Sequence, residues 1–168
     1  MTKKDNDILD FLPMTFITIL FILQILIGFY LLPDISQNKV LAYTGVGLYV
    51  FSGWVFGMLP IFEFRKKGDV KKGKSYVNTT KIVDTGLYSI VRHPQFITWI
   101  LWAIAGMLLF QHWIVILLGI PIIPLTYVDL VRADKRLIKK FGEDYKKYMK
   151  KVPRANFIFG IIKKIREK

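Results

Sequence analysis

A short polar run placed directly before a long apolar segment holds the residues best suited to chemistry. It contains Gly86, Tyr88 and Arg92-His93-Pro94, in the order G-x-Y-x-x-x-R-H-P. Charged and titratable side chains are costly in hydrocarbon. Their position where a loop enters an apolar segment therefore indicates that they act on a ligand at the membrane interface. Taken singly, Tyr88 fits an interfacial anchor and Arg92 a membrane-flanking cation. The ordered combination favours a functional site.

A second group of residues lies about fifty positions further along the chain. It runs from Phe141-Gly142-Glu143-Asp144-Tyr145 to Val152-Pro153-Arg154. Together the two groups resemble the integral-membrane methyltransferases typified by isoprenylcysteine carboxyl methyltransferase and the phospholipid methyltransferases. The resemblance covers roughly Lys81 to Arg154, and the apolar segments before it match only as generic membrane spans.

The resemblance implies methyl transfer from S-adenosylmethionine. In such a reaction the cofactor supplies the reactivity, and the protein binds, aligns and desolvates the two reactants. In this family, the stretch before the glycine turn and the His-Pro-x-aromatic after it form much of the cofactor pocket. Carried over position by position, and with the glycine turn included, the expected cofactor-binding residues are Thr80, Lys81, Ile82, Val83, Gly86, Tyr88, His93, Pro94, Gln95 and Phe96.

Three positions depart from the family pattern, which usually has two adjacent glutamates before the Phe-Gly and an arginine shortly before them. This chain has Ala133, Asp134 and Asp129 there. Asp134 keeps the acidic character, so we expect it to bind the cofactor's ammonium group or a ribose hydroxyl. Asp129 replaces an arginine that holds the substrate carboxylate. We therefore expect Asp129 and Arg92 to be catalytic toward an acceptor other than a prenylcysteine. The alternative for Asp129 is a structural salt bridge to Arg92 or Arg132.

Composition sets the broad class of the protein. The chain has 168 residues, of which 53% are hydrophobic, and this is too apolar for an ordinary soluble domain. The formal net charge is +13, and the cations flank apolar segments, so the expected partner is anionic lipid headgroups rather than nucleic acid. The chain has no cysteine, which excludes thiolate catalysis and cysteine-ligated metals, and its two distant histidines disfavour any metal site.

The hydropathy pattern predicts a single all-α integral membrane domain over residues 1–168. The expected transmembrane helices cover residues 14–32, 40–62, 94–110 and 113–131. The last two come from one apolar run, which as a single helix would extend roughly 50 Å. Its interruption at Gln111-His112-Trp113 therefore predicts a helical hairpin, with the return leg kinked at Pro121 and Pro124.

The distribution of positive charge predicts the orientation. Lysine and arginine are concentrated in the expected loop 63–93 and in the tail 132–168. The positive-inside rule places both segments in the cytoplasm, together with both termini and the cofactor site. In the tail, apolar residues recur at spacings of three and four, which predicts amphipathic helices lying on the membrane. They are Leu137, Phe141, Tyr145, Tyr148 and Val152.

The leading functional hypothesis is methylation of a lipophilic or membrane-embedded small acceptor at an oxygen, nitrogen or sulfur atom. Two other classes stay open at this point. One is a membrane reductase of the sterol-reductase type that uses NADPH. The other is a membrane scaffold without enzymatic activity. Binding of S-adenosylhomocysteine or of NADPH would separate the three hypotheses.

Overall fold

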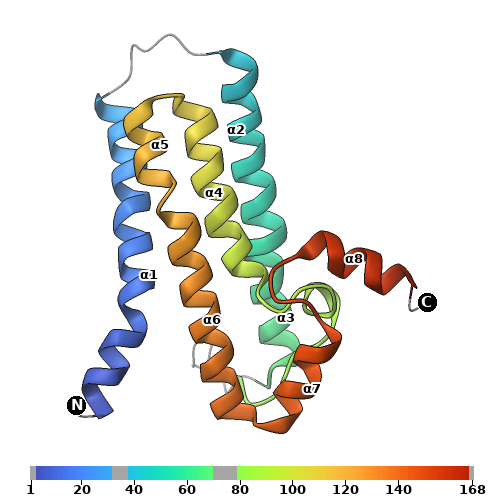
Figure 1. The fold of residues 1–168 in the computed structure, drawn as a ribbon. Coiled ribbons are helices and arrows are strands. Elements are labelled where there is room, and N and C mark those ends of the chain that lie inside the picture. The colour runs from blue at the N-terminus through green and yellow to red at the C-terminus, as the bar shows by residue number, and fades with distance from the viewer. Residues whose placement is uncertain (1–2, 32–37, 70–78, 167–168) are drawn as a thin grey trace. The chain divides into compact units, whose positions relative to one another are not determined.

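The computed structural model describes residues 3–31, 38–69 and 79–166, and over these ranges the chain is helical with no β-strand (Figure 1). It divides into two compact units. We call Met1–Ser52 with Trp99–Ala133 the helical unit, and Gly53–Thr98 with Asp134–Lys168 the loop unit. Each unit is described below by itself.

The helical unit is built from long apolar helices that run alongside one another (Figure 1). They are α1 (Lys3–Leu26), continued by the π-helix η1 (Ile27–Leu31), then α2 (Lys39–Ser52), most of α4 (Pro94–Phe110), α5 (Trp113–Gly119) and the first part of α6 (Ile122–Phe141). A buried cluster of Ile17, Ala103 and Ile122 joins α1, α4 and α6. Apolar residues at helical spacing dominate these segments because each helix presents an apolar face to this buried cluster.

A buried polar side chain ties three of these helices together. Gln24 on α1 is fully buried, and its Nε2 donates to the carbonyl oxygens of Ala103 at 3.1 Å and Val115 at 3.2 Å. A polar side chain in an apolar core must find such partners to offset its desolvation. On the neighbouring side, the Trp102 indole donates to the Tyr49 carbonyl oxygen at 3.2 Å, which joins α4 to α2.

The expected interruption of the third apolar run is confirmed. Helix α4 ends at Phe110, α5 begins at Trp113, and the His112 ring accepts a hydrogen bond from the Ile114 amide at 3.3 Å. The expected kink is also present, because α5 ends at Gly119 and α6 begins after Pro121. Pro124 causes no break, since it lies in the first turn of α6, where an amide hydrogen has no helical partner.

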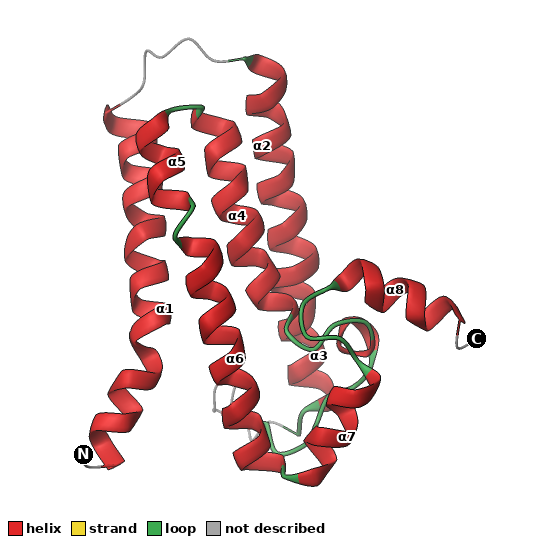
Figure 2. Cartoon of the chain, in the orientation of Figure 1, coloured by secondary structure: helices red, strands yellow, loops and turns green. Residues whose placement is uncertain are grey.

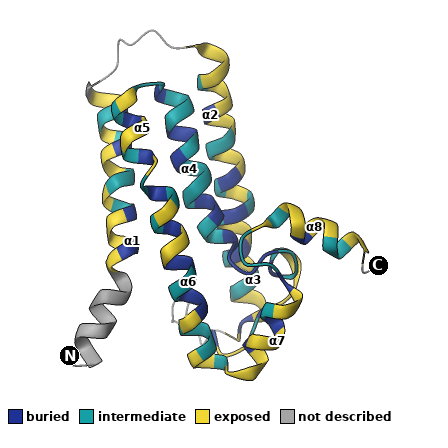
Figure 3. Ribbon diagram, viewed as in Figure 1, coloured by how far each residue is buried: buried dark blue, intermediate teal, exposed yellow. Residues whose placement is uncertain are grey.

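Among the residues that the structure describes, three helices are long and apolar enough to cross a membrane, namely Leu12–Tyr30, Lys39–Lys67 and Trp113–Phe141. Pro94–Phe110 is apolar but shorter. Large apolar side chains are exposed along α1 and α2, where much of the ribbon is coloured yellow for exposed residues in Figure 3. Large exposed apolar surfaces are unusual in soluble proteins and are expected where lipid covers a helix.

Two element boundaries differ from those expected. The second apolar helix continues through the π-helix η2 (Gly53–Met58) into α3 (Leu59–Lys67), five residues into the expected loop. Three basic residues, Arg65, Lys66 and Lys67, form its last turn, where cations interact favourably with the helix dipole. Helix α6 similarly continues to Phe141, ten residues beyond the expected end of the span.

The loop unit combines short helices with irregular segments, which are green in Figure 2. Its elements are η2, α3, the 3₁₀ turn η4 (Gly86–Ser89), the first residues of α4, the end of α6, α7 (Glu143–Lys151) and α8 (Phe157–Arg166). Gly142, with φ of 59°, separates α6 from α7. This left-handed conformation favours glycine and lets the chain reverse direction between the two helices.

The amphipathic stripe of the tail lies on two helices and packs within the unit. Tyr145, Tyr148 and Val152 are buried against Ile82, Leu137 and Phe141. The expectation that this stripe lies on the membrane was therefore wrong for α7. The physical reason is that the segment around Ile82 returns over the stripe and supplies an apolar protein surface in place of lipid. In contrast, most apolar residues of α8 are exposed: Ile158, Phe159, Ile161, Ile162 and Ile165.

Candidate functional site

A buried carboxylate, Asp134, lies at the centre of a hydrogen-bonded cluster in the loop unit. The residue lies in the second half of α6 and is 2% exposed. Its Oδ1 accepts from the His93 Nε2 at 2.7 Å and the Tyr145 hydroxyl at 2.8 Å. Its Oδ2 accepts from the Arg154 Nε at 2.7 Å and lies 3.3 Å from the Arg92 Nη2. We call these five residues the Asp134 cluster.

Backbone pairing brings the two sequence groups together. The amide of Arg92 donates to the Pro153 carbonyl oxygen at 3.0 Å, and the amide of His93 donates to the Arg154 carbonyl oxygen at 3.2 Å. Pro94 then begins α4, as expected of a residue with a fixed φ and no amide hydrogen. The pairing holds Arg92, His93 and Arg154 close together, and all three contact the Asp134 carboxylate.

The imidazole of His93 is held in its neutral form. Burial lowers the pKa of His93, and the positive charges of Arg92 and Arg154 lower it further, against the opposing effect of the Asp134 carboxylate. At neutral pH the ring therefore donates a single hydrogen bond from Nε2 to Asp134 and carries no charge. Burial likewise raises the pKa of Tyr145, so that its hydroxyl remains a proton donor to the same carboxylate.

Beside the cluster is a hollow of about 320 Å³, a volume that includes its open mouth. Its walls are mostly aromatic and aliphatic, with two cationic side chains. They are Phe64, Thr79, Lys81, Ile82, Val83, Tyr88, Arg92, Leu137, Phe141, Tyr145 and Tyr148. Arg92 and Tyr145 belong to both the hollow and the Asp134 cluster, so the cluster fixes part of the wall.

The aromatic wall is held by specific contacts. The Tyr148 hydroxyl donates to the Tyr88 carbonyl oxygen at 2.5 Å, and the Phe64 and Tyr88 rings meet edge to face with centroids 4.6 Å apart. Burial raises the pKa of Tyr148, so this hydroxyl also stays protonated. Buried tyrosines with satisfied hydroxyls provide rigid aromatic surface for a ligand.

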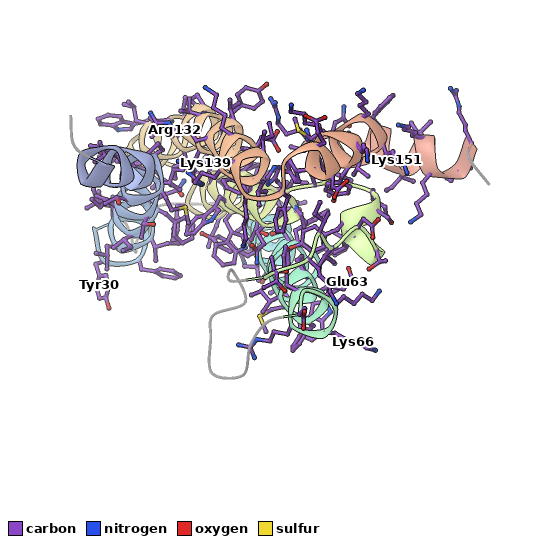
Figure 4. The ribbon with its side chains drawn as sticks, turned by 90° about the horizontal axis from the view of Figure 1, so that it is seen from below. Tyr30, Glu63, Lys66, Arg132, Lys139 and Lys151 are labelled. Carbon is purple, nitrogen blue, oxygen red and sulfur yellow. The ribbon has the colours of Figure 1, made fainter. Side chains whose placement is uncertain are left out.

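Glu63 positions the glycine turn that leads to Tyr88. Its carboxylate accepts from the Leu87 amide at 3.1 Å and from the Lys67 ammonium at 3.3 Å. Gly86 has φ of 54°, and a Cβ at this residue would collide with the Glu63 carboxylate, so both the backbone conformation and the space require glycine. Glu63 and the neighbouring Lys66 are labelled on α3 in Figure 4.

The structure brings many of the predicted site residues to one place. Lys81, Ile82, Val83, Tyr88 and Arg92 line the hollow, and His93 and Asp134 support it through the cluster. Thr80 is exposed beside Asp69, Gly86 forms the turn, and Pro94 is buried at the start of α4. Gln95 and Phe96 are half-buried in the first turn of α4, where the Phe96 ring meets the His93 ring edge to face at 5.5 Å. Asp129 is buried within the helical unit.

Sequence reasoning did not assign several residues of this site. Glu63 and Phe64 lie in the segment expected to follow a membrane span, and nothing in their spacing indicated a contact with Leu87 or Tyr88. Tyr145 and Tyr148 were recognised only as part of an apolar stripe. Their hydroxyl groups, which lie on the buried face of α7, were a usable signal that these two residues belong to a site. Arg154 was recognised in the second motif, but no local pattern pairs it with Asp134.

Comparison with known proteins agrees with this geometry. Residues 71–139 match the Isoprenylcysteine carboxyl methyltransferase (ICMT) family. Similar curated proteins include the protein-S-isoprenylcysteine O-methyltransferases of Schizosaccharomyces pombe (29% identity over 121 residues), Homo sapiens (27% over 139) and Xenopus laevis (32% over 134).

These alignments cover 71%, 77% and 77% of this chain but 49%, 46% and 45% of the three relatives, so the chain spans about half of their length. No solved structure gives a significant match to the chain. The resemblance predicted from the two motifs is confirmed: over residues 71–139 this chain is similar to the isoprenylcysteine carboxyl methyltransferase family of membrane methyltransferases.

Proposed function

We propose that this protein is a methyltransferase that uses S-adenosylmethionine to methylate a lipophilic acceptor delivered from the membrane. The observation that carries the proposal is the aromatic-walled hollow beside the Asp134 cluster, because seven of its eleven lining residues fall in the segment that matches the methyltransferase family. Three more, Phe141, Tyr145 and Tyr148, follow that segment along the chain. The cofactor, when bound, supplies an electrophilic methyl group on a sulfonium centre.

The residues of the hollow fit the parts of this cofactor. Tyr88, Tyr145 and Phe64 offer aromatic faces, which attract a sulfonium cation as they attract other cations. The irregular segment 81–85 offers backbone groups for an adenine edge. In this proposal the hollow is lined by Lys81, Ile82, Val83 and Tyr88, and His93 and Asp134 act by fixing its wall. Thr80, Gly86, Pro94, Gln95 and Phe96 shape the segments that carry these residues.

The proposed acceptor follows from the names of the relatives and from one position at which this chain departs from the family pattern. The names of the relatives specify O-methylation of an S-isoprenylcysteine, which is a lipophilic group with a carboxylate. In this chain the acidic Asp129 stands at the family's arginine position, so we propose that Asp129 acts on an acceptor that is cationic or must lose a proton. The acceptor atom is then oxygen, nitrogen or sulfur.

Ligand binding by detergent-purified protein tests the function. We expect the wild type to bind S-adenosylhomocysteine with micromolar affinity in calorimetry, and NADPH not to bind. His93→Ala should weaken S-adenosylhomocysteine binding by roughly tenfold to a hundredfold, because it removes a buried hydrogen bond that fixes the wall. His112→Ala is the matched control, since that ring caps α5 in the helical unit. NADPH binding would select a reductase, and binding of neither ligand would favour a scaffold.

We further propose four crossings, with α4 as the shortest, both termini and the hollow on the cytoplasmic side, and α8 in contact with anionic headgroups. The basic residues in the last turns of α3, α6 and α8 and the exposed apolar face of α8 support this arrangement.

Because the chain has no cysteine, single cysteines report the topology cleanly. In intact cells, an impermeant maleimide should label cysteines placed at Lys39 and Gln111 but not those at Lys66 and Arg166. All four positions should label after the membrane is permeabilised. Labelling of Arg166→Cys from outside would require an odd number of crossings and would contradict the proposed orientation.

A further inference from the structure

One side of helix α8 is apolar and exposed, and much of the helix is yellow in Figure 3. Five large apolar side chains, which we call the apolar face of α8, are 42–68% exposed: Ile158, Phe159, Ile161, Ile162 and Ile165. An exposed patch of large apolar side chains marks a surface that binds a partner or a membrane. The arrangement of α8 within the loop unit shows what such binding would affect.

The other side of α8 packs on the turn that carries Tyr88. Gly160 lies so close to the carbonyl oxygen of Ile90 that a Cβ would collide with it. Further along α8, the ammonium group of Lys164 donates to the hydroxyl of Ser89, the last residue of η4. Helix α8 is therefore in direct contact with the end of the η4 turn and the residue that follows it.

Helix α8 also contacts the end of α7. The ammonium group of Lys163 donates to the Lys151 carbonyl oxygen at 2.6 Å. The two segments that α8 contacts carry three aromatic residues of the hollow: Tyr88 from η4, and Tyr145 and Tyr148 from α7. These segments are themselves joined by the hydrogen bond from the Tyr148 hydroxyl to the Tyr88 carbonyl oxygen. Helix α8 thus bridges two walls of the hollow from outside.

Charge and position favour an anionic lipid surface as the partner of the apolar face. Fourteen of the 25 lysine and arginine residues lie in segment 132–168, against four of the 12 acidic residues, so a second copy of the chain would be repelled there. The Phe157 ring at the start of α8 lies 5.3 Å from the ring of Phe56, which belongs to the membrane-spanning candidate Lys39–Lys67. Anionic lipid offers both an apolar layer and negative headgroups to such a helix.

We infer that α8 binds an anionic membrane surface through its apolar face and that this binding regulates the hollow. The inference rests on the proposed function, because the regulated site is the proposed cofactor site. Lipid bound to the outer face of α8 keeps the helix docked on η4 and α7, so the aromatic walls are already ordered when the ligand arrives. Without anionic lipid the walls have more freedom, and the ligand binds more weakly because it must order them.

Nanodiscs of two compositions test the lipid binding, one of phosphatidylcholine alone and one of phosphatidylcholine with phosphatidylglycerol. Because the chain has no cysteine, Ile165→Cys carries a single environment-sensitive dye on the apolar face. We expect the dye emission to shift to shorter wavelength in the anionic nanodiscs, as the dye enters lipid. The shift should become smaller at high salt, which screens the attraction between lysine side chains and headgroups.

Binding of S-adenosylhomocysteine in the same nanodiscs tests the regulation. We expect the wild type to bind at least about fivefold more tightly in the anionic nanodiscs, a typical size for coupling between two sites. Amide hydrogen exchange over residues 86–91 provides a readout without ligand. It should be slower with anionic lipid, because the amides of Ile90 and Val91 both donate to the Leu87 carbonyl oxygen in the ordered turn.

Two matched double variants separate the apolar face from the rest of α8. Ile161→Gln with Ile165→Gln should bind S-adenosylhomocysteine in both nanodiscs only as tightly as the wild type does in phosphatidylcholine. Ile161→Leu with Ile165→Leu keeps the apolar face and should retain the full lipid effect. Gly160→Ala, which removes the close contact with Ile90, should keep the dye shift and lose the lipid effect on ligand affinity.

Three results would overturn the inference. They are equal ligand affinity and equal exchange over residues 86–91 in the two nanodiscs, a dye shift of the same size in both, and a shift in detergent that grows with protein concentration. The last result would identify a second copy of the chain as the partner. If S-adenosylhomocysteine bound in neither nanodisc while dye and exchange responded to anionic lipid, the proposed function would fail and the regulation of the hollow would stand.

Discussion

Asp134→Ala is expected to lower the free energy of unfolding by about 3–5 kcal/mol, because it leaves buried arginine charge without its counter-ion. The carboxylate is contacted by Arg92, His93, Tyr145 and Arg154, and each of these loses its contact with the carboxylate in the variant. Thermal unfolding of the detergent-purified protein, followed by intrinsic fluorescence, measures the effect. The same variant should lose affinity for S-adenosylhomocysteine, since Arg92 and Tyr145 form part of the wall.

Asp144→Ala is the matched control for Asp134→Ala. Asp144 is on the nearby helix α7 and its side chain is 76% exposed beside Lys147. Exposed ion pairs contribute little to stability, so its melting temperature should be nearly unchanged. A similar small change for Asp134→Ala would mean that the buried Arg92 finds another partner, and the cluster would then not be the centre of the site.

Gly160→Ala is expected to displace α8 from the loop unit. A Cβ at this position would collide with the Ile90 carbonyl oxygen, a backbone atom that cannot move aside as a flexible side chain can. Overpacking of this kind costs typically about 1–3 kcal/mol. The readout is a lower melting temperature together with faster proteolysis after Lys163 or Lys164, whose side chains otherwise contact the Lys151 carbonyl oxygen and the Ser89 hydroxyl.

Gly47→Ala, the same glycine-to-alanine change in α2, is expected to have the opposite effect on the melting temperature. Gly47 is an exposed residue within α2, and a Cβ there would meet no atom within 4 Å. Replacing a glycine inside a helix with alanine stabilises it by roughly 0.5–1 kcal/mol, so this variant should melt slightly higher. Equal melting temperatures for Gly47→Ala and Gly160→Ala would contradict the close packing of α8 on Ile90.

The sequence was sufficient for features that depend on local composition and spacing. Runs of apolar residues predicted the long helices, because hydrocarbon accepts only backbone whose hydrogen bonds are satisfied within the helix. The interruption at Gln111-His112-Trp113 and the break at Pro121 were also predicted, since both reflect backbone preferences of the residues themselves. The motif around Arg92-His93-Pro94 indicated the family resemblance and the part of the chain that carries the site.

Only the tertiary structure decided how that site is assembled. The contact of His93 with Asp134 joins residues 41 positions apart, and that of Glu63 with Leu87 joins residues 24 apart. No local pattern encodes such pairs, because several acids and bases along the chain could satisfy one another equally well in sequence terms. Amphipathic spacing also leaves the position of a helix undetermined: α7 and α8 are both amphipathic, yet α7 buries its apolar residues against Ile82, while most apolar residues of α8 are exposed. Amphipathic spacing specifies that a face seeks an apolar neighbour, and the fold alone determines whether that neighbour is protein.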